Sequence, residues 1–333
     1  MRYNTISSKD FSNIIQYILI KKRLLIYKIT KKASSFPSAI CIQTINHCNG
    51  SCIMCPIGKS KGNKVKVMSN DLFEKIIVEA SKNHLPFTYV YLFLQNEPLL
   101  DKEIFRKLIL IKKLSNGRLK TGIVTNGTLF TDKKIEELLL SDVDELICSI
   151  DALTENTYNK IRQGLNFKTL MININKIIDS GYDKYLAVKF VIQKDNISEL
   201  HDFRRFWRGK NIPIQLSTLN NRSGDLDLYN GLKIHRTKNS FLVKIIHNIR
   251  NDLLRKMAHK VCPVPITTFN ILYNGDVILC CDDFSNKMII GNVNQLSIKE
   301  IWNSKKYDLI RDLLFEGKNK EISVCQRCSK MEK

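Results

Sequence analysis

The 333-residue sequence predicts an α/β fold, a partial (β/α)6 barrel of parallel strands followed by a small cysteine-rich hairpin-plus-helix module. Six short apolar runs alternate with helical segments, and this alternation predicts right-handed crossovers onto a parallel sheet. Further along, an Asn-Gly pair between two apolar runs predicts a β-hairpin, and the chain closes on two cysteines separated by two residues. Six strands fit an open barrel better than a closed eight-stranded one.

The elements of the barrel follow from apolar patterning and helix caps. Strands are expected over residues 39–45, 88–94, 119–125, 145–150, 186–192 and 213–218. Helices are expected over residues 69–83, 101–115, 131–141, 167–180 and 197–208, several of them opening with Ser, Asp or Thr. Because chemistry in such barrels lies at the carboxyl ends of the strands, the loops after the strands are the places to search for functional residues.

The last part of the chain predicts a compact module. "FNILYNGDVILCC" predicts a hairpin around Asn274-Gly275, and "SIKEIWNSKKYDLIRDLL" predicts one helix after a Ser297 cap. We therefore expect four parts: a basic amphipathic N-terminal segment over 1–38, the barrel over 39–218, a basic helical linker over 219–261 and the cysteine-rich module over 262–333.

Positive charge is in excess and unevenly placed. The chain has 53 Lys and Arg against 32 Asp and Glu, a net charge of +21. Residues 1–66 carry twelve basic residues against Asp10 alone, and residues 233–260 carry eight against Asp252. Such patches attract anionic partners, although solvated helix faces account for them as well. Aromatic residues are not interleaved with the basic ones, which argues against nucleic acid binding.

No run approaches the roughly 18 apolar residues of a transmembrane helix, and no secretory pattern is present, so we expect a cytoplasmic protein. The segment "FSNIIQYILIKKRLLIYKITKK" predicts a lysine-rich amphipathic helix. This helix would make a peripheral contact with an anionic membrane, cover the open barrel or bind a partner.

Three cysteines follow the first strand. Cys48, Cys52 and Cys55 have the order Cys-x3-Cys-x2-Cys. In a reducing compartment, clustered cysteines are metal ligands or catalytic groups. A structural zinc site needs four ligands, and the neighbouring His47 is poorly placed to supply the fourth. Three thiolates can instead hold three corners of a cubane iron–sulfur cluster and leave one iron open to a ligand.

This spacing resembles that of the radical S-adenosylmethionine (SAM) superfamily, in which the open iron binds the amino and carboxylate groups of SAM. Two further strand-end loops agree. "LQNEPLL" resembles the Gly-Gly-Glu element of the family, with Gln95-Asn96 in place of Gly-Gly. "TNGTLF" resembles its Thr-Asn-Gly element, although Asn126-Gly127 by itself is also an ordinary turn signal.

The resemblance implies a set of SAM-binding residues. Asn96 and Glu97 would receive the SAM ammonium group, and Ser149 and Asp151 would contact its sugar and carboxylate region. Met54 would lie near the adenine, and Arg162 is either a carboxylate clamp or a solvated helix residue. The full implied set is Met54, Asn96, Glu97, Thr125, Asn126, Ser149, Asp151 and Arg162.

A second cysteine set lies in the C-terminal module. Cys262, Cys280, Cys325 and Cys328 would gather four thiolates around one metal centre, for which a zinc ribbon is one interpretation. The layout, with "GNV" and "EIW" after the hairpin, resembles the SPASM and twitch modules that hold auxiliary clusters. The resemblance thus implies SAM, two [4Fe-4S] clusters, one SAM-binding and one auxiliary, and a reductase, flavodoxin or ferredoxin as electron donor.

Cys281 has two interpretations. Because adjacent side chains of a hairpin strand face opposite ways, we expect only one cysteine of the pair to bind the cluster, and we take Cys280 as that ligand. Cys281 is then a packed thiol or a hydrogen-atom donor of the kind that related epimerases use.

The resemblance implies reductive cleavage of SAM to a 5′-deoxyadenosyl radical that takes a hydrogen atom from the substrate. One reading is oxidation or epimerisation of an anionic sugar or aminocyclitol, favoured by the single auxiliary cluster and the basic patches. A second is modification of a ribosomally made peptide or a protein side chain. A third is a non-catalytic zinc-binding scaffold or nucleic-acid protein, against which the agreement of the strand-end motifs argues.

Overall fold

The computed structural model of the chain describes residues 8–60, 64–234 and 261–329. Within them the strands form one nine-stranded sheet in the order β6-β5-β4-β3-β2-β1-β7-β8-β9. Each pair of neighbours from β6 to β7 runs parallel. The barrel strands are β1 (Ala39–Ile42), β2 (Tyr89–Tyr91), β3 (Lys120–Thr125), β4 (Glu145–Ser149), β5 (Leu186–Ile192) and β6 (Ile214–Thr218). The predicted partial barrel is therefore confirmed.

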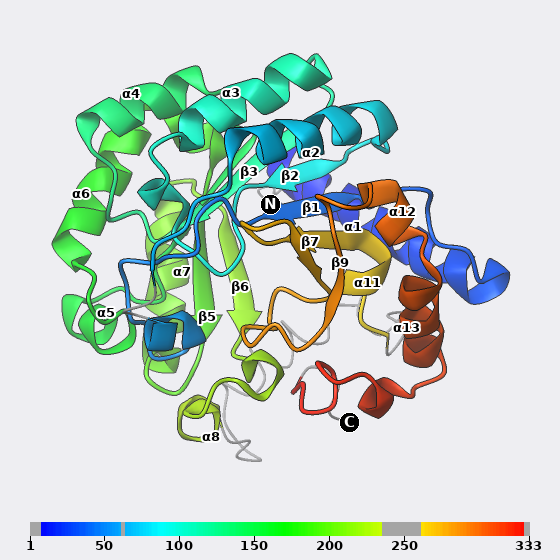
Figure 1. Cartoon of the computed structure of the whole chain (residues 1–333). Coiled ribbons are helices and arrows are strands. Elements are labelled where there is room, and N and C mark those ends of the chain that lie inside the picture. Colours follow the sequence, from blue (N-terminus) through cyan, green and yellow to red (C-terminus); the bar gives the residue numbers. More distant parts are fainter. Residues whose placement is uncertain (1–7, 61–63, 235–260, 330–333) are drawn as a thin grey trace, which may run out of the picture.

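Helices cover the outer face of these strands (Figure 1). They are α2 (Asn70–Asn83), α3 (Ile104–Ser115), α4 (Asp132–Leu140), α5 (Glu155–Ile161), α6 (Phe167–Ile177) and α7 (Leu200–Gly209). Side-chain oxygens of Ser69 and Thr131 cap α2 and α4 at their N-termini, as the sequence predicts. Helix α5, a short helix whose N-cap is Thr154, has no counterpart among the predicted helices.

The C-terminal module continues the barrel sheet. Its strands are β7 (Thr268–Ile271), β8 (Asp276–Ile278) and β9 (Ile289–Asn292), and β7 pairs in parallel with β1 in the register Ala39 to Thr268. The predicted hairpin turn joins β7 to β8, with Gly275 at a φ of 87°, which a glycine adopts without strain. The N-terminal part of the chain and its last strands thus share one sheet.

The single helix predicted over residues 297–314 is wrong. The structure has two helices, α12 (Ile298–Trp302) and α13 (Lys305–Phe315). Ser297 caps the first, as predicted, but the side chain of Ser304 caps a second helix by accepting from the backbone N–H of Tyr307. Asn-Ser in the middle of an apolar helical pattern was the signal for this break.

The remaining elements are short, apart from the N-terminal helix α1 (Ser8–Thr30). Helix α11 (Val264–Thr267) precedes β7, and α8 (Tyr229–Leu232) lies in the segment expected as a linker, of which residues 235–260 fall outside the described residues. The single-turn elements are η1 (Pro56–Ser60), η2 (Pro98–Leu100), η3 (Ile178–Tyr182), η4 (Asp183–Tyr185), η5 (Ile197–Glu199), η6 (Arg222–Gly224) and η7 (Asn319–Glu321).

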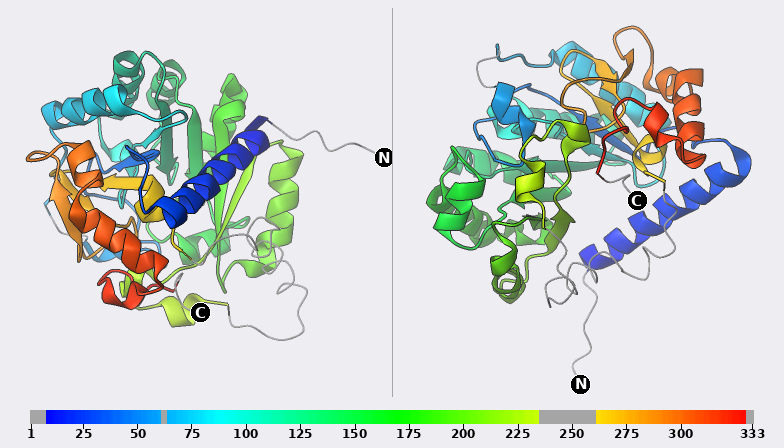
Figure 2. Two further views of the ribbon diagram at one scale, coloured as in Figure 1. Left: turned by 90° about the vertical axis from the view of Figure 1, so that its right-hand side faces the viewer. Right: turned by 90° about the horizontal axis from the view of Figure 1, so that it is seen from below.

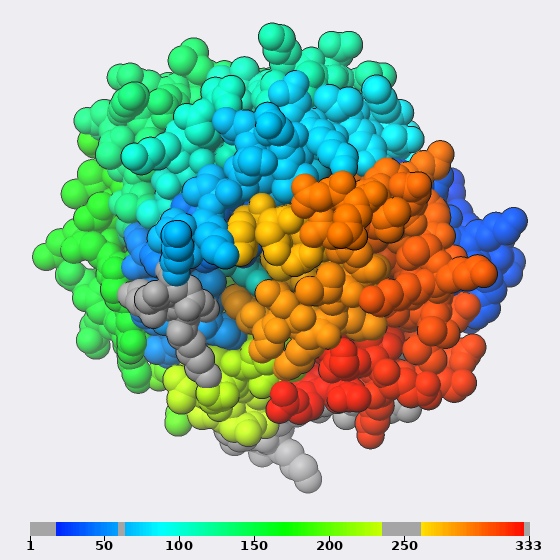
Figure 3. Space-filling view, viewed as in Figure 1, coloured from blue at the N-terminus to red at the C-terminus, as the bar shows by residue number. Residues whose placement is uncertain are grey.

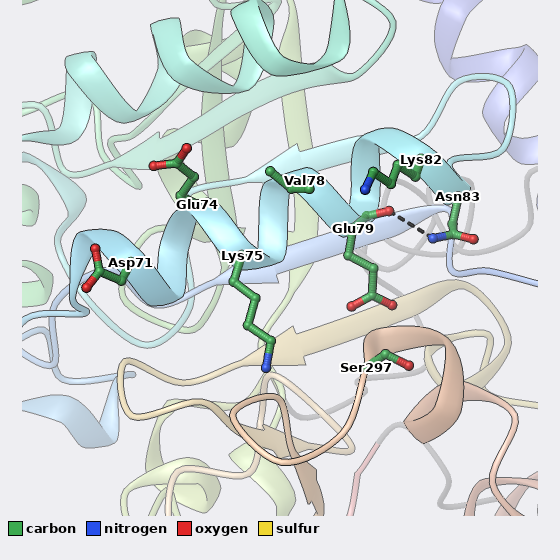
Figure 4. Close-up of a pocket in the computed structure, with 8 residues that line it drawn as sticks. All are labelled: Asp71, Glu74, Lys75, Val78, Glu79, Lys82, Asn83 and Ser297. Carbon is green, nitrogen blue, oxygen red and sulfur yellow. Dashed lines mark hydrogen bonds between the residues drawn. The ribbon is translucent and has the colours of Figure 1, made fainter.

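Side chains of helix α2 in the barrel form hydrogen bonds with the backbone of the C-terminal module. The Glu79 carboxylate accepts hydrogen bonds from the backbone N–H groups of Ile298 (2.8 Å) and Lys299 (2.9 Å), where α12 begins. Lys75 Nζ donates to the carbonyl of Val293 at 2.6 Å. Figure 4 shows both side chains reaching from α2 toward the module and Ser297. The barrel and the module lie side by side on the face seen in Figure 3.

We predict that Glu79→Ala lowers the free energy of unfolding by about 1.5–3 kcal/mol, because two helix N–H groups lose a charged acceptor. Urea unfolding followed by circular dichroism measures this change. The matched control is Glu74→Ala on the exposed side of the same helix, where a change within about 0.5 kcal/mol is expected. Equal losses for the two variants would contradict this role of Glu79.

Candidate active site

The three-cysteine loop follows β1 and is held by backbone hydrogen bonds to the α5 region. Ser51 N–H donates to the carbonyl of Gln163 at 2.7 Å, and Ile53 N–H donates to that of Ile161 at 3.0 Å. The loop also contacts the loop after β3, because Asn126 Nδ2 donates to Asn49 Oδ1 at 2.8 Å. The thiols of the loop are thus placed by two neighbouring strand-end segments.

Cys48, Cys52 and Cys55 line one cavity. Burial raises the pKa of Cys48 to about 12, and the nearby carboxylate of Glu97 and the thiols of Cys52 and Cys55 act in the same direction. A cation beside Cys48 would offset the effect of burial and of the neighbouring thiols on its ionisation, and soft thiolates suit iron–sulfur clusters. The donor set therefore fits a cluster held by three protein ligands.

Glu97 lies at the end of the loop after β2 and is fully enclosed. Its carboxylate accepts from Thr125 Oγ1 (2.5 Å), Asn126 N–H (2.7 Å) and Leu99 N–H (3.0 Å). Burial raises its pKa, and these three hydrogen bonds oppose the rise. A carboxylate offers about four acceptor positions, so one remains for a ligand in the cavity that Glu97 lines.

Asn96 offers a donor to the same cavity. Its Oδ1 accepts from Leu94 N–H at 2.8 Å. Its Nδ2 is buried, and no described residue accepts a hydrogen bond from it. An amide nitrogen in this state suits a carboxylate oxygen, whereas the resemblance implied contact with an ammonium group.

Asp151 and Arg162 form a buried ion pair behind the cavity. Asp151 has positive φ, at 64°, and accepts from Arg162 Nε (2.8 Å) and Nη2 (2.5 Å) and from Val191 N–H (2.6 Å). Its carboxylate is therefore engaged by the protein, while Arg162 lines the cavity and its Nη1 donates to Cys52 Sγ at 3.7 Å. Arg162 is a buried residue and not a solvated helix residue.

The cavity has a volume of about 680 Å³, which lies within the range of small-molecule sites. Its walls come from residues of β3 to β6, from the segments that follow β1, β2, β3, β4 and β6, and from the loop after β8. It brings together most of the residues that the sequence singled out. These are Cys48, Cys52, Met54, Cys55, Asn96, Glu97, Thr125, Asn126, Ser149, Arg162 and Cys281.

Three charged residues of the cavity, Lys189, Arg222 and Asp282, are not among the residues predicted from sequence motifs. Lys189 lies on β5. Burial lowers its pKa most, and the nearby charge of Arg222 lowers it further. Arg222 follows β6 and pairs with the buried Asp282 at 2.6 Å. A lysine inside the apolar run "LAVKFVI" was a usable signal, whereas nothing in the loop sequence marked Arg222.

Cys280 and Cys281 lie beyond the end of β8, so the alternation of side chains along a strand does not govern them. They nevertheless meet different surroundings. Cys280 packs against the main core together with Cys325, whereas Cys281 packs beside Cys41 and lines the cavity. Their sulfur atoms and a carboxylate oxygen of Asp282 lie within 4.8 Å of one another.

The thiols of the C-terminal set lie near each other. Burial raises the pKa of Cys325 to about 12, and the nearby thiols of Cys262 and Cys328 add to this shift. The thiol of Cys262 likewise contributes to the raised pKa of Cys280, after larger effects of Cys281 and burial. Four thiols in one electrostatic neighbourhood fit a thiolate-bound metal centre.

Comparison with known proteins agrees with this geometry. Residues 42–206 match the family model of the radical SAM superfamily, and residues 262–329 match that of the SPASM iron-sulfur cluster-binding domain. A similar curated protein is the S-adenosyl-L-methionine-dependent 2-deoxy-scyllo-inosamine dehydrogenase of Niallia circulans, 22% identical over 88% of this chain and 92% of that protein.

Two solved structures share the fold. BtrN in complex with AdoMet and 2-DOIA has a TM-score of 0.59 at 21% identity and covers 88% of this chain and 92% of its own. Streptococcus suis SuiB bound to precursor peptide SuiA has a TM-score of 0.66 at 16% identity and covers 99% of this chain and 76% of its own.

The chain is a radical SAM enzyme with a C-terminal SPASM-type module. The cofactors of this class are SAM with a [4Fe-4S] cluster in the barrel and auxiliary iron–sulfur in the module. No helix among the described residues is long and apolar enough to cross a membrane.

We predict that Arg162→Met lowers the free energy of unfolding by about 3–5 kcal/mol, because it leaves the carboxylate of Asp151 buried and uncompensated. Chemical denaturation of the wild type and the variant measures the loss. The control is Arg205→Met in the exposed Arg205–Asp202 pair, for which about 0–1 kcal/mol is expected. A loss at Arg162 no larger than that at Arg205 would show that the buried pair does not stabilise the site.

Proposed function

We propose that the enzyme abstracts a hydrogen atom from an anionic sugar or aminocyclitol and oxidises it. One observation carries the proposal. A single cavity has the three-cysteine loop in one wall and the loop after β8, next to the second cysteine set, in another. A substrate between them would lie beside the site of radical formation and beside an electron acceptor.

The residues of the barrel hold and position the cofactor. Cys48, Cys52 and Cys55 are the proposed cluster ligands, Glu97 accepts from the SAM ammonium group, and Asn96 Nδ2 donates to a SAM carboxylate oxygen. When bound, the cluster and SAM supply the one-electron chemistry that generates a 5′-deoxyadenosyl radical. What the chain contributes is placement of the reacting atoms and exclusion of water.

Other residues position these groups, line the same cavity or hold the second cluster. Thr125 and Asn126 orient Glu97, and Asp151 orients Arg162. Met54 and Ser149 line the same cavity and would contact the adenine and the sugar of SAM. Cys262, Cys280, Cys325 and Cys328 are the proposed ligands of the auxiliary cluster.

The charges of the cavity favour an acidic substrate. Arg162 is paired with Asp151, and Arg222 is paired with Asp282. No described carboxylate forms an ion pair with Lys189. Lys189 is half-buried and lines the cavity, so a carboxylate or phosphate of the substrate would pair with its ammonium group. The aminocyclitol in the name of the Niallia circulans protein would share its ring and hydroxyl group with the proposed substrate. It would lack the negative charge proposed here.

A peptide substrate is the second candidate. The likeness to SuiB bound to a precursor peptide supports it at the level of the fold. The size of the cavity favours the small molecule. The required electron donor is a small redox protein or a reductase, and thiolate-bound clusters favour a cytoplasmic setting.

Cys281 supports a variant of the first proposal. Cys281 lines the same cavity, and in this variant its S–H would give a hydrogen atom to a substrate carbon radical. This transfer would yield an epimer and a thiyl radical, which takes up one electron and one proton to return to the thiol. Oxidation instead requires the substrate radical to lose one electron and one proton.

We predict about eight irons per chain after anaerobic reconstitution, and about four when Cys48, Cys52 and Cys55 are all changed to alanine. Only the first protein should form 5′-deoxyadenosine from SAM under reductant. Cys148→Ala serves as the control, because this thiol lies in the apolar core and should leave the iron content unchanged. Bound zinc without iron would exclude the proposed chemistry.

Isotope uptake distinguishes oxidation from inversion. For a substrate that stimulates 5′-deoxyadenosine formation, oxidation gives a product two mass units lighter, whereas inversion in D₂O gives an epimer one unit heavier. Mass spectrometry of the product makes this measurement. In the inversion case Cys281→Ala should abolish deuterium uptake and leave 5′-deoxyadenosine formation in place; undiminished uptake would remove Cys281 as the donor.

A further inference from the structure

Helix α1 carries an exposed apolar stripe. Ile18, Leu25, Ile26 and Ile29 are 55%, 50%, 42% and 73% exposed. At 100° per residue, positions 18, 25 and 29 lie on one side of a helix, and position 26 lies beside them. Large aliphatic side chains arranged in this way on a solvent-facing side indicate an interaction surface.

The opposite side of α1 is fixed to the C-terminal module. Leu24 and Tyr27 are buried and pack with Ile266. The ring of Tyr27 lies 4.8 Å from that of Phe315, and its hydroxyl donates to Asp312 Oδ1 at 3.2 Å. Figure 2 shows α1 along the outside of the molecule in both views. The packing of Leu24 and Tyr27 against the module therefore fixes the rotation of α1, so that the apolar stripe faces the solvent.

Basic residues accompany the stripe. Lys22 lies within it, Lys28 lies along one border, and Lys32 follows two residues after the end of α1, all three exposed. Residues 18–34 contain six Lys and Arg and no Asp or Glu. Lys31 is engaged by Asp312 at 3.3 Å on the side that faces the module. The exposed side of α1 is thus both aliphatic and cationic.

The aliphatic stripe and the exposed lysines together favour one kind of partner. A second copy of the chain would bring two rows of lysines together, which opposes pairing through this face. Nucleic acid would use the lysines but leave the aliphatic stripe in water. An anionic lipid surface accepts both, because aliphatic side chains insert below the headgroups while lysines extend to the phosphates.

We propose that α1 docks the enzyme on anionic membranes through Ile18, Leu25, Ile26 and Ile29, with Lys22, Lys28 and Lys32 at the headgroups. This surface is separate from the cavity, so docking and radical chemistry are independent properties. Membrane docking would concentrate the enzyme where acidic, membrane-associated molecules lie.

The test is co-sedimentation of the reconstituted full chain, under anaerobic conditions, with vesicles of phosphatidylcholine alone or with about 30% phosphatidylserine. We expect binding to the phosphatidylserine vesicles only, weakened by high salt. Lys22→Gln/Lys28→Gln/Lys32→Gln should lower the partition coefficient about 100-fold. Leu25→Ser/Ile29→Ser should lower it at least about tenfold.

Matched controls separate this surface from general charge and apolarity. The variants Lys102→Gln/Lys133→Gln/Lys305→Gln and Leu140→Ser/Leu309→Ser change exposed residues outside α1 and should bind as the wild type does. Equal binding by the wild type and the two α1 variants overturns the proposal, as does no binding to phosphatidylserine vesicles. A wild-type dimer that Leu25→Ser/Ile29→Ser dissociates in sedimentation equilibrium would also overturn it, in favour of a second copy.

Discussion

The parallel pairing of β1 with β2 on one side and β7 on the other is the constraint on which the site depends. Parallel strands bring their carboxyl ends to one edge of the sheet. The three-cysteine loop after β1 therefore lies between the Glu97 loop after β2 and the hairpin that β7 begins. The central place of β1 explains how residues more than two hundred positions apart line one cavity.

Hydrogen bonds between the strand-end loops then make the arrangement rigid. Glu97 draws together the loops after β2 and β3, and Asn126 joins the latter to the cysteine loop. Asp151 holds Arg162 against Cys52 from the far side. The side chains of Glu97, Asn126, Asp151 and Arg162 are buried and hydrogen-bonded. They therefore hold the loops in one defined geometry without the free-energy cost of unpaired buried polar groups.

The positive charge of the chain has more than one structural setting. In the cavity, two arginines form ion pairs with aspartates, whereas no carboxylate of the described residues forms an ion pair with Lys189. On α1, lysines stand in water beside exposed aliphatic residues. The first setting concerns the substrate and the second the location of the enzyme. A count of basic residues alone could not separate the two settings, because it does not show which of the residues are buried.

The sequence by itself determined the alternating strands, the three-cysteine loop and the class of chemistry, because these depend on local periodicity and on ligand spacing within one loop. The starts of β3 to β6 agree with the expected ones within one residue for the same reason. Tertiary structure decided the rest. It joined β7 to β1, showed that Asn96 presents a donor and turned the Asp151 carboxylate toward Arg162. It also brought Lys189, Arg222 and Cys281 into one cavity. Those outcomes depend on contacts between segments far apart in the chain, which no local pattern specifies.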